Sequence, residues 1–190
     1  MQAVNPLRLA TALLAVAALS AAVILATSDA SAKPHPRGDT ARIEMKFDGK
    51  HAPFFKGDDT IEAGGKLTIV NKSNPQEIGP HTFSVVTQDA LKEIHVNKAK
   101  CAHLKLKVCK NVAKAHQIDF QEETVGKPDV DNGKKGWDAG FSDTEKKGDT
   151  WFSFNKNDKT SRKVKLDAGS KLYYFCFIHP EMEGKIKVVK

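Results

Sequence analysis

Short runs in which apolar and polar residues alternate are grouped toward the two ends of the chain, and they predict β-strands. In the run 41–47, Ile43 and Met45 share one face, and Asp48-Gly49 then marks a turn. Similar runs are found at 54–55, 60–61, 66–71, 82–87, 162–166, 171–177 and 184–189. Short strands separated by turn signals predict an all-β sandwich.

The segment 88–160 does not follow this rhythm and predicts a long insert in the sandwich. Its first part is basic, with seven lysines and one glutamate between residues 91 and 116. Its second part, 117–150, has nine acidic residues and five lysines, so the insert carries a separation of charge. Residues 89–95 are expected to start a short helix within it.

The rest of the insert is expected to be extended or irregular. Residues 104–108 alternate leucine or valine with lysine, as a half-buried strand does. Residues 126–148 are rich in Gly, Asp and Lys, and loops anchored by Trp137 and Phe141 are expected there. The insert is therefore predicted to be partly helical or irregular.

The first 32 residues have the composition of a signal peptide. An almost uninterrupted apolar run, 9–26, follows a single positive charge, and Ala30-Ser31-Ala32 has the small-x-small form of a cleavage site. We expect residues 33–40 to be a flexible leader and 41–190 to be one domain. Export to the periplasm, the cell surface or the exterior follows. A retained membrane anchor is the alternative, because the run is at the short limit for crossing a bilayer.

The chemistry of the chain is concentrated near the C-terminus, where Cys176, His179 and Met182 follow one another in steps of three residues. Thiolate and thioether sulfur are soft ligands that favour copper, and two His, one Cys and a weak axial Met form a blue-copper site. His81, at the start of a predicted strand, is the best placed second histidine. Zinc would call for four strong ligands, so Met182 favours copper over zinc.

Two blocks of sequence resemble the cupredoxins, and especially amicyanins and plastocyanins. The spacing Cys-x-x-His-x-x-Met-x-Gly over 176–184 is similar to the short ligand loop of amicyanins. Residues 64–71 and Pro80-His81 are similar to the strand and first-ligand segments of the same family. The resemblance covers about 110 residues, flanks the insert, and implies a Greek-key sandwich that binds one type 1 copper ion.

The resemblance also implies residues around the ligands, and there the chain departs from the family twice. Asn71 and Thr82 are candidates for the surroundings of the site. Thr82 stands where Asn is common, and its hydroxyl is expected to tie the ligand loops together instead. Ile178 stands where many relatives have Pro. Phe177, Ile178 and Pro180 are expected to form a hydrophobic docking rim around His179.

Three cysteines in an exported chain indicate one disulfide and one thiol with another use. Cys101 and Cys109 are the expected pair, and their bond requires the chain to reverse between them, because a disulfide needs Cα atoms within about 7 Å. The alternative is a second metal site that uses both cysteines with His103 and either His95 or His116.

A net charge of +7 at pH 7 suggests an acidic partner or an anionic surface. We expect a monomeric one-electron carrier that serves a redox protein, acidic or membrane-bound. No enzyme activity, small-molecule substrate or nucleic-acid partner is expected. The alternative is a copper-binding or copper-delivery protein. A copper oxidase or nitrite reductase would need a second copper centre, and no His-x-His pair is found in the sequence.

Overall fold

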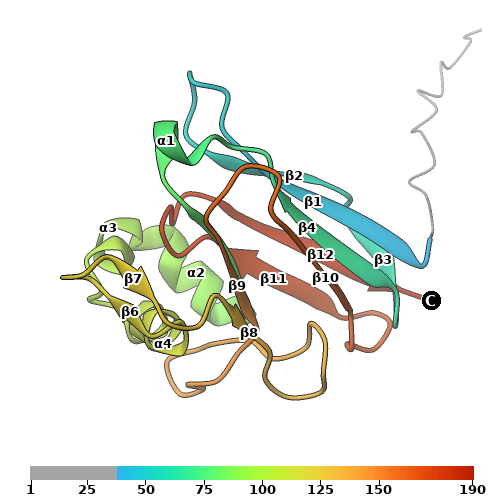
Figure 1. Cartoon of the computed structure of the whole chain (residues 1–190). Helices are drawn as coiled ribbons and strands as arrows, with labels where there is room; N and C mark the ends of the chain where they lie inside the picture. The colour runs from blue at the N-terminus through green and yellow to red at the C-terminus, as the bar shows by residue number, and fades with distance from the viewer. Residues whose placement is uncertain (1–37) are drawn as a thin grey trace, which may run out of the picture. The chain divides into compact units, whose positions relative to one another are not determined.

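The computed structural model describes residues 38–190 (Figure 1). The predicted signal peptide, its alternative as a membrane anchor, and most of the leader lie outside these residues. Within 38–190, no helix combines the length and the apolar character that crossing a bilayer requires.

Most strands of the described part of the chain belong to two mixed sheets. The first has the order β10 (Lys159–Lys163), β4 (Lys66–Asn71), β1 (Thr40–Lys46) and β2 (Phe54–Gly57). The second has the order β3 (Thr60–Glu62), β12 (Glu183–Val189), β11 (Lys171–Phe175), β5 (His81–Val86), β9 (Thr150–Ser153) and β8 (Asp129–Val130). A separate hairpin pairs β6 (Ile118–Asp119) with β7 (Thr124–Val125). Strand β1 runs parallel to β4, and β12 runs parallel to β3.

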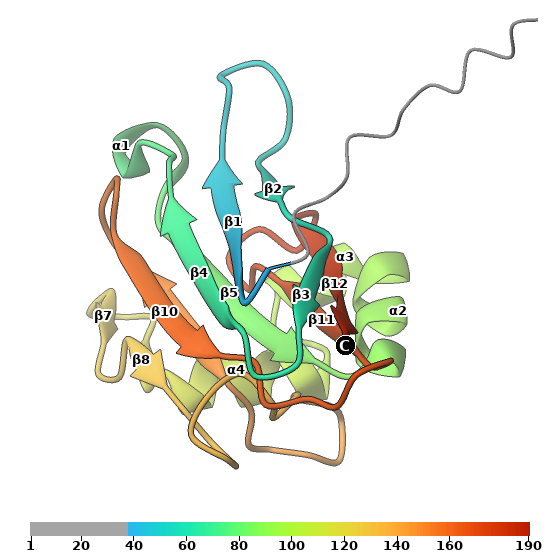
Figure 2. The same cartoon turned by 90° about the vertical axis from the view of Figure 1, so that its right-hand side faces the viewer.

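The two sheets face each other across the main core. Alternating residues of β1, β4, β5, β11 and β12 are buried there, as the sequence pattern predicts. Phe83 is stacked on Tyr174 with 4.6 Å between ring centroids, and the Trp137 ring meets Phe83 edge-on at 5.1 Å. Figure 2 shows the first sheet from its outer side, with β10, β4 and β1 side by side. The predicted β-sandwich is confirmed.

Three helices of the insert cover the outer face of the second sheet (Figure 1). They are α2 (Gln88–Val96), α3 (Lys98–Ala102) and α4 (Lys107–Ala115). Their apolar sides and the outer face of the sheet form a second core with the buried residues Val86, Ala90, Ile94, Cys101, Leu106, Val108, Cys109, Val112, Ala113, Phe141, Phe175 and Phe177. A further short helix, α1 (Pro75–Ile78), lies between β4 and β5 and is capped by the Asn74 side chain.

Strand β11 is consequently buried on both faces. Leu172, Tyr174 and Cys176 point into the main core, whereas Phe175 and Phe177 point into the second core. Cys176 therefore belongs to the main core and follows directly on the end of β11.

The expectation of a strand at 104–108 is wrong. Leu104 has a left-handed backbone (φ 55°), and Lys107 begins the helix α4. The alternation is accidental, because the buried residues Val108, Cys109, Val112 and Ala113 recur with the period of a helix. Residues 98–115 thus form two helices and a reversal between them.

That reversal brings the two cysteines of the insert together, and the predicted disulfide is confirmed. Cys101 and Cys109 are bonded, with 5.5 Å between their Cα atoms. Since both sulfurs are used in the bond, neither is a thiolate that could bind a metal. The alternative of a second metal site at these cysteines is therefore wrong.

Three strands of the sandwich lie within or overlap the segment 88–160, and one of them is the two-residue strand β8. β9 pairs with β5 in the second sheet, and β10 begins at Lys159 rather than at the predicted 162. β10 lies at the edge of the first sheet, where residues are exposed and polar, so it lacks an apolar signal. β9 is short and follows a loop without alternation, which hides it from the sequence pattern.

Candidate metal centre

Neighbouring strands bring the candidate ligands to one end of the sandwich. His81 begins β5, and Cys176 follows the last residue of β11. Since β5 and β11 are antiparallel, with Phe175 opposite Ser84, the start of one strand lies beside the end of the other. His179 belongs to the loop that links β11 to β12.

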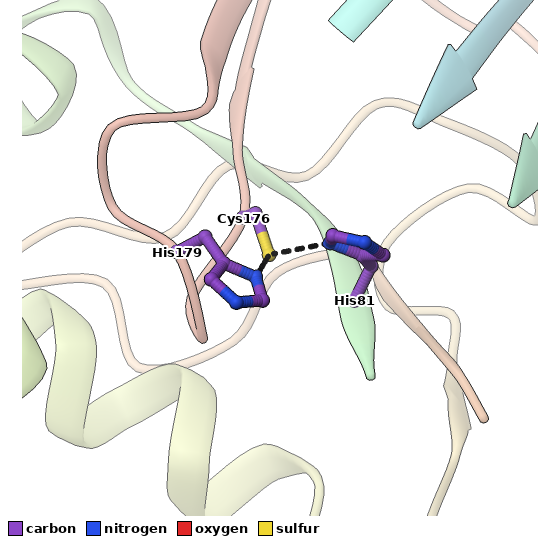
Figure 3. A group of neighbouring side chains, drawn as sticks. All are labelled: His81, Cys176 and His179. Atoms are coloured by element: carbon purple, nitrogen blue, oxygen red, sulfur yellow. Dashed lines mark hydrogen bonds between the residues drawn. The ribbon is translucent and has the colours of Figure 1, made fainter. Parts of the chain in front are cut away.

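Three of the four predicted ligand residues form one cluster (Figure 3). The Cys176 sulfur lies 3.9 Å from Nδ1 of His81 and 3.7 Å from Nδ1 of His179. One donor atom from each of these residues lies within 4.8 Å of the others. Figure 3 shows both rings turned toward the sulfur.

These separations suit three ligands of one metal ion. Imidazole nitrogen binds at about 2.0 Å and thiolate sulfur at about 2.3 Å in zinc sites, the nearest well-defined reference. Two such ligands on one ion, at angles of roughly 110–120°, are about 3.6–3.8 Å apart. The observed separations of 3.7 and 3.9 Å lie close to this range.

The hydrogen bond of His179 leaves the nitrogen nearest the sulfur free to bind a metal. Nε2 of His179 lies 2.9 Å from the backbone oxygen of Ile78, the last residue of α1. A carbonyl oxygen can only accept, so Nε2 carries the ring proton and Nδ1 of the neutral ring keeps its lone pair. Such an outer hydrogen bond fixes the tautomer and orientation of a metal-binding histidine.

Burial sets the protonation of the cluster in the metal-free protein. It lowers the pKa of His81 to about 4, assisted by the neighbouring His179. Burial also lowers the pKa of His179. It raises the pKa of the Cys176 thiol, although the Thr82 backbone amide opposes this by donating to the sulfur. At neutral pH both imidazoles are neutral, and the sulfur holds a proton that a metal must displace.

Thr82 ties the two ligand segments together. Its backbone amide donates to the Cys176 sulfur at 3.2 Å, and its hydroxyl lies 3.8 Å from the same sulfur. The hydroxyl also accepts a hydrogen bond from the Phe177 amide at 2.6 Å. The threonine thus has the linking geometry that its place in the sequence predicts.

Met182 is buried in the main core, to which Cys176 also belongs, with 1% of its surface exposed. Its backbone closes the ligand loop, because it accepts from the Cys176 amide at 2.9 Å and donates to the His179 carbonyl at 2.8 Å. Gly184, at the end of the motif, lies against the Tyr174 ring, which a Cβ atom there would approach to 2.6 Å. The ligand role of Met182 stays a prediction.

Asn71 is buried, but its side-chain hydrogen bond is to Ser73 and not to a residue of the cluster. Its Oδ1 accepts from the Ser73 amide at 2.9 Å, and Nδ2 has no partner among residues 38–190.

The docking rim expected around His179 differs from the prediction, because Phe177 and Pro180 are buried and only Ile178 is partly exposed. Phe177 is taken up by the second core under the helices.

Comparisons with known proteins found solved structures to which this chain has low similarity. No family model matches the sequence, and no curated protein matches it either. An auracyanin from the photosynthetic bacterium Roseiflexus castenholzii is 15% identical, with a TM-score of 0.41 over 81% of this chain and 99% of that chain. A purple cupredoxin from Nitrosopumilus maritimus is 13% identical, with a TM-score of 0.39 over 78% and 98%. Rusticyanin from Thiobacillus ferrooxidans is 19% identical, with a TM-score of 0.36 over 80% and 83%.

The likeness in fold rests on the strands and side chains of this chain itself. Two mixed sheets enclose the main core, and a His-Cys-His cluster lies at one end of it, between β5 and the loop after β11. These features confirm the resemblance seen in the ligand motifs: the chain has the fold of a cupredoxin.

Proposed function

We propose that this protein is an exported type 1 copper protein that carries single electrons, with His81, Cys176, His179 and Met182 as the copper ligands. The observation that carries the proposal is the convergence of two imidazole nitrogens on one buried sulfur. Two nitrogens and a thiolate, with a thioether nearby, form the donor set that copper prefers and that zinc does not require.

The surroundings of the ligands support electron transfer. A bound copper ion would supply a one-electron couple. The protein contributes ligands that are held in place: Cys176 and His81 have 0% of their surface exposed, and His179 is bonded to Ile78. A site whose ligands are already in position rearranges little when its charge changes, and exchange is therefore fast.

The same features make copper delivery the weaker function. Release of copper to an acceptor needs ligands that can move apart. Here Thr82, next to His81, is hydrogen-bonded to Cys176 and Phe177 of the other ligand segment, and two backbone hydrogen bonds close the loop from Cys176 to Met182. The partly exposed His179 is the ligand nearest to solvent, and we assign to it the contact with a redox partner.

Export is supported by two independent features. The sequence of residues 1–32 has the order of a signal peptide. In the described part of the chain, the disulfide between Cys101 and Cys109 indicates an oxidising compartment, since cytosolic thiols are mostly kept reduced.

The visible spectrum tests the copper site. Addition of one equivalent of Cu(II) is expected to produce an intense absorption band from thiolate-to-copper charge transfer, and Cys176→Ser is expected to abolish it. His51→Gln, which removes an exposed histidine outside the cluster, should leave the band unchanged. A protein that binds copper without any such band would contradict the proposal.

Two further measurements separate the carrier from a delivery protein and test Met182. A carrier should cycle reversibly at an electrode and retain Cu(I) against a moderate chelator, whereas a delivery protein should lose it. Met182→Leu keeps the volume of the side chain but removes the sulfur. We expect the blue band to persist and the reduction potential to rise, because the axial ligand tunes the potential. An unchanged potential would remove Met182 from the ligand set.

A further inference from the structure

A chain of buried hydroxyl groups connects the insert to the sulfur of the candidate site. Nε2 of His116 lies 2.8 Å from the hydroxyl of Thr150, which lies 2.7 Å from the hydroxyl of Ser84. Ser84 in turn lies 3.3 Å from the Thr82 hydroxyl, and that hydroxyl lies 3.8 Å from the Cys176 sulfur. Each of the five residues has 0% of its surface exposed. We call the hydroxyls of Thr150, Ser84 and Thr82 the hydroxyl chain.

The sheet itself builds this arrangement. Ser84 of β5 and Thr150 of β9 are directly paired across the two strands. Thr82 and Ser84 lie two residues apart, so their side chains share the face of β5 that the insert covers. His116 follows the last residue of α4, and its ring packs edge-on against Phe152 with 5.4 Å between centroids.

The other ring nitrogen fixes the tautomer of His116. Nδ1 lies 2.7 Å from the backbone oxygen of Lys127, which can only accept. Nδ1 therefore carries a proton in every state of the ring. In the neutral ring Nε2 can only accept, whereas in the charged ring it donates to Thr150.

The number of hydrogens in the chain decides whether the Thr82 hydroxyl donates to the Cys176 sulfur. Five links connect the Lys127 oxygen to the Cys176 sulfur through the ring and the hydroxyl chain. When the sulfur is a thiolate, as it is on a metal ion, three hydroxyls and a neutral ring supply four hydrogens for five links. In the direction that the geometry gives, Ser84 donates to Thr82 at 3.3 Å and Thr82 donates to the sulfur at 3.8 Å. When Nε2 of His116 has to accept from Thr150, the hydroxyls turn toward the ring, and the longest link, to the sulfur, is left without a hydrogen. A charged ring fills every link, and the Thr82 hydroxyl then has to point at the sulfur.

We propose that His116 is a positioning residue, whose second ring proton acts through the hydroxyl chain to turn the Thr82 hydroxyl toward the Cys176 sulfur. This inference rests on the proposed copper function. A hydrogen bond to the thiolate withdraws electron density from it and stabilises the reduced ion, so it raises the reduction potential. His116 thereby couples the potential to pH from a position outside the ligand set.

The charged groups that face His116 decide where this coupling acts. Burial lowers the pKa of His116, whereas the Lys127 carbonyl and the Asp129 carboxylate oppose that shift. Asp129 on β8 is itself paired with Arg162 of β10, which moderates its influence. The ring is therefore neutral at neutral pH and gains its second proton as the pH falls.

The first test measures the reduction potential of the copper-loaded protein against pH. A hydrogen bond to the charged sulfur should favour the reduced state over the oxidised state roughly tenfold. For a one-electron couple, that tenfold change is about 59 mV. The potential should rise by this order as the pH falls through the pKa of His116. His116→Gln and Thr150→Val should both remove this component, and the charge-transfer band should stop shifting with pH.

A matched control keeps a structural effect apart from the proposed one. Thr68→Val removes one hydroxyl of another close pair, to Ser161 at 2.8 Å in the first sheet, and should leave the pH profile unchanged. If Thr150→Val keeps the wild-type profile while the copper band is intact, the role of His116 is refuted.

The second test needs no copper and separates this inference from the proposed function. In the metal-free protein, the ring nitrogens of His116 and the Cβ of Cys176 are followed by NMR during a pH titration. The Cys176 Cβ signal should follow the titration of His116 in the wild type and should lose that dependence in Thr150→Val. If this coupling is seen but copper gives no charge-transfer band, the proposed function fails and the positioning role of His116 stands. If the band appears without the coupling, the positioning role of His116 fails.

Discussion

At the scale of single residues, burial prepares the candidate ligands for different tasks. It lowers the pKa of His81 to about 4 and also lowers the pKa of His179, so both rings offer lone pairs at neutral pH. It raises the pKa of the Cys176 thiol, so the sulfur is protonated until a metal takes the place of that proton. The negative charge of the thiolate therefore arises only together with the positive charge of the ion.

Proton release on copper binding tests these protonation states of the two imidazoles and the thiol. At pH 7 we expect about one proton to be released for each ion, from Cys176, because the imidazoles carry no extra proton to lose. Affinity should therefore rise with pH, and it should weaken more steeply as the pH falls toward 4 and His81 becomes charged. Calorimetry in buffers of different ionisation enthalpy measures the release. Release of two protons at pH 7 would show that an imidazole is charged in the metal-free protein.

At the scale of elements, the insert is a structural part of the sandwich. Its helices cover the outer face of β5 and β11, where Phe175 and Phe177 flank the candidate ligand Cys176. The disulfide between Cys101 and Cys109 fixes α3 to α4 inside this second core. The strand that carries the thiol is thus held from both sides, which limits its movement.

Removal of the disulfide should therefore weaken the fold more than the site. For a loop of this length, loss of the bond is expected to lower the free energy of unfolding by about 2–3 kcal/mol. The double variant Cys101→Ala with Cys109→Ala should show this in urea titrations and retain the charge-transfer band. Lys110→Ala, on the exposed side of α4, is the control and should change stability little. Loss of the band in the double variant would mean that the insert holds the ligands directly.

At the scale of the whole molecule, charge is the property most relevant to partners. The net charge is +7, and the exposed lysines of the insert include Lys92, Lys100, Lys105, Lys107, Lys110 and Lys114. A surface of this kind attracts anions and speeds their encounter at low ionic strength. The charge thus favours an acidic redox partner.

Small redox reagents of opposite charge test this attraction. Electron exchange with an anionic iron cyanide complex should slow on the order of tenfold between low and high salt, whereas exchange with a cationic ruthenium ammine should not. Stopped-flow absorbance at the copper band measures both rates. Lys105→Glu, Lys107→Glu and Lys110→Glu together change the charge by two units each, from +7 to +1, and should remove most of the salt dependence. Equal salt dependence for both reagents would exclude steering by charge.

The local pattern was sufficient to predict a strand where the apolar or polar character of each residue matches its burial. Alternation predicted β4 at its observed bounds, and turn residues separated β1 from β2. It failed at 104–108, where a chance alternation covered a reversal, and at β9, whose four residues are all buried and do not alternate. In both places the packing of distant segments outweighs local preference.

The sequence by itself determined the soft donor set and the spacing of Cys176, His179 and Met182, because a loop of seven residues keeps its members close in any fold. Only the tertiary structure decided that His81, 95 residues before Cys176, approaches the same sulfur. It alone aligned His116, Thr150 and Ser84 into a path of hydrogen bonds. Such a path has no local signal, since it exists only after strands from distant parts of the chain have paired in register.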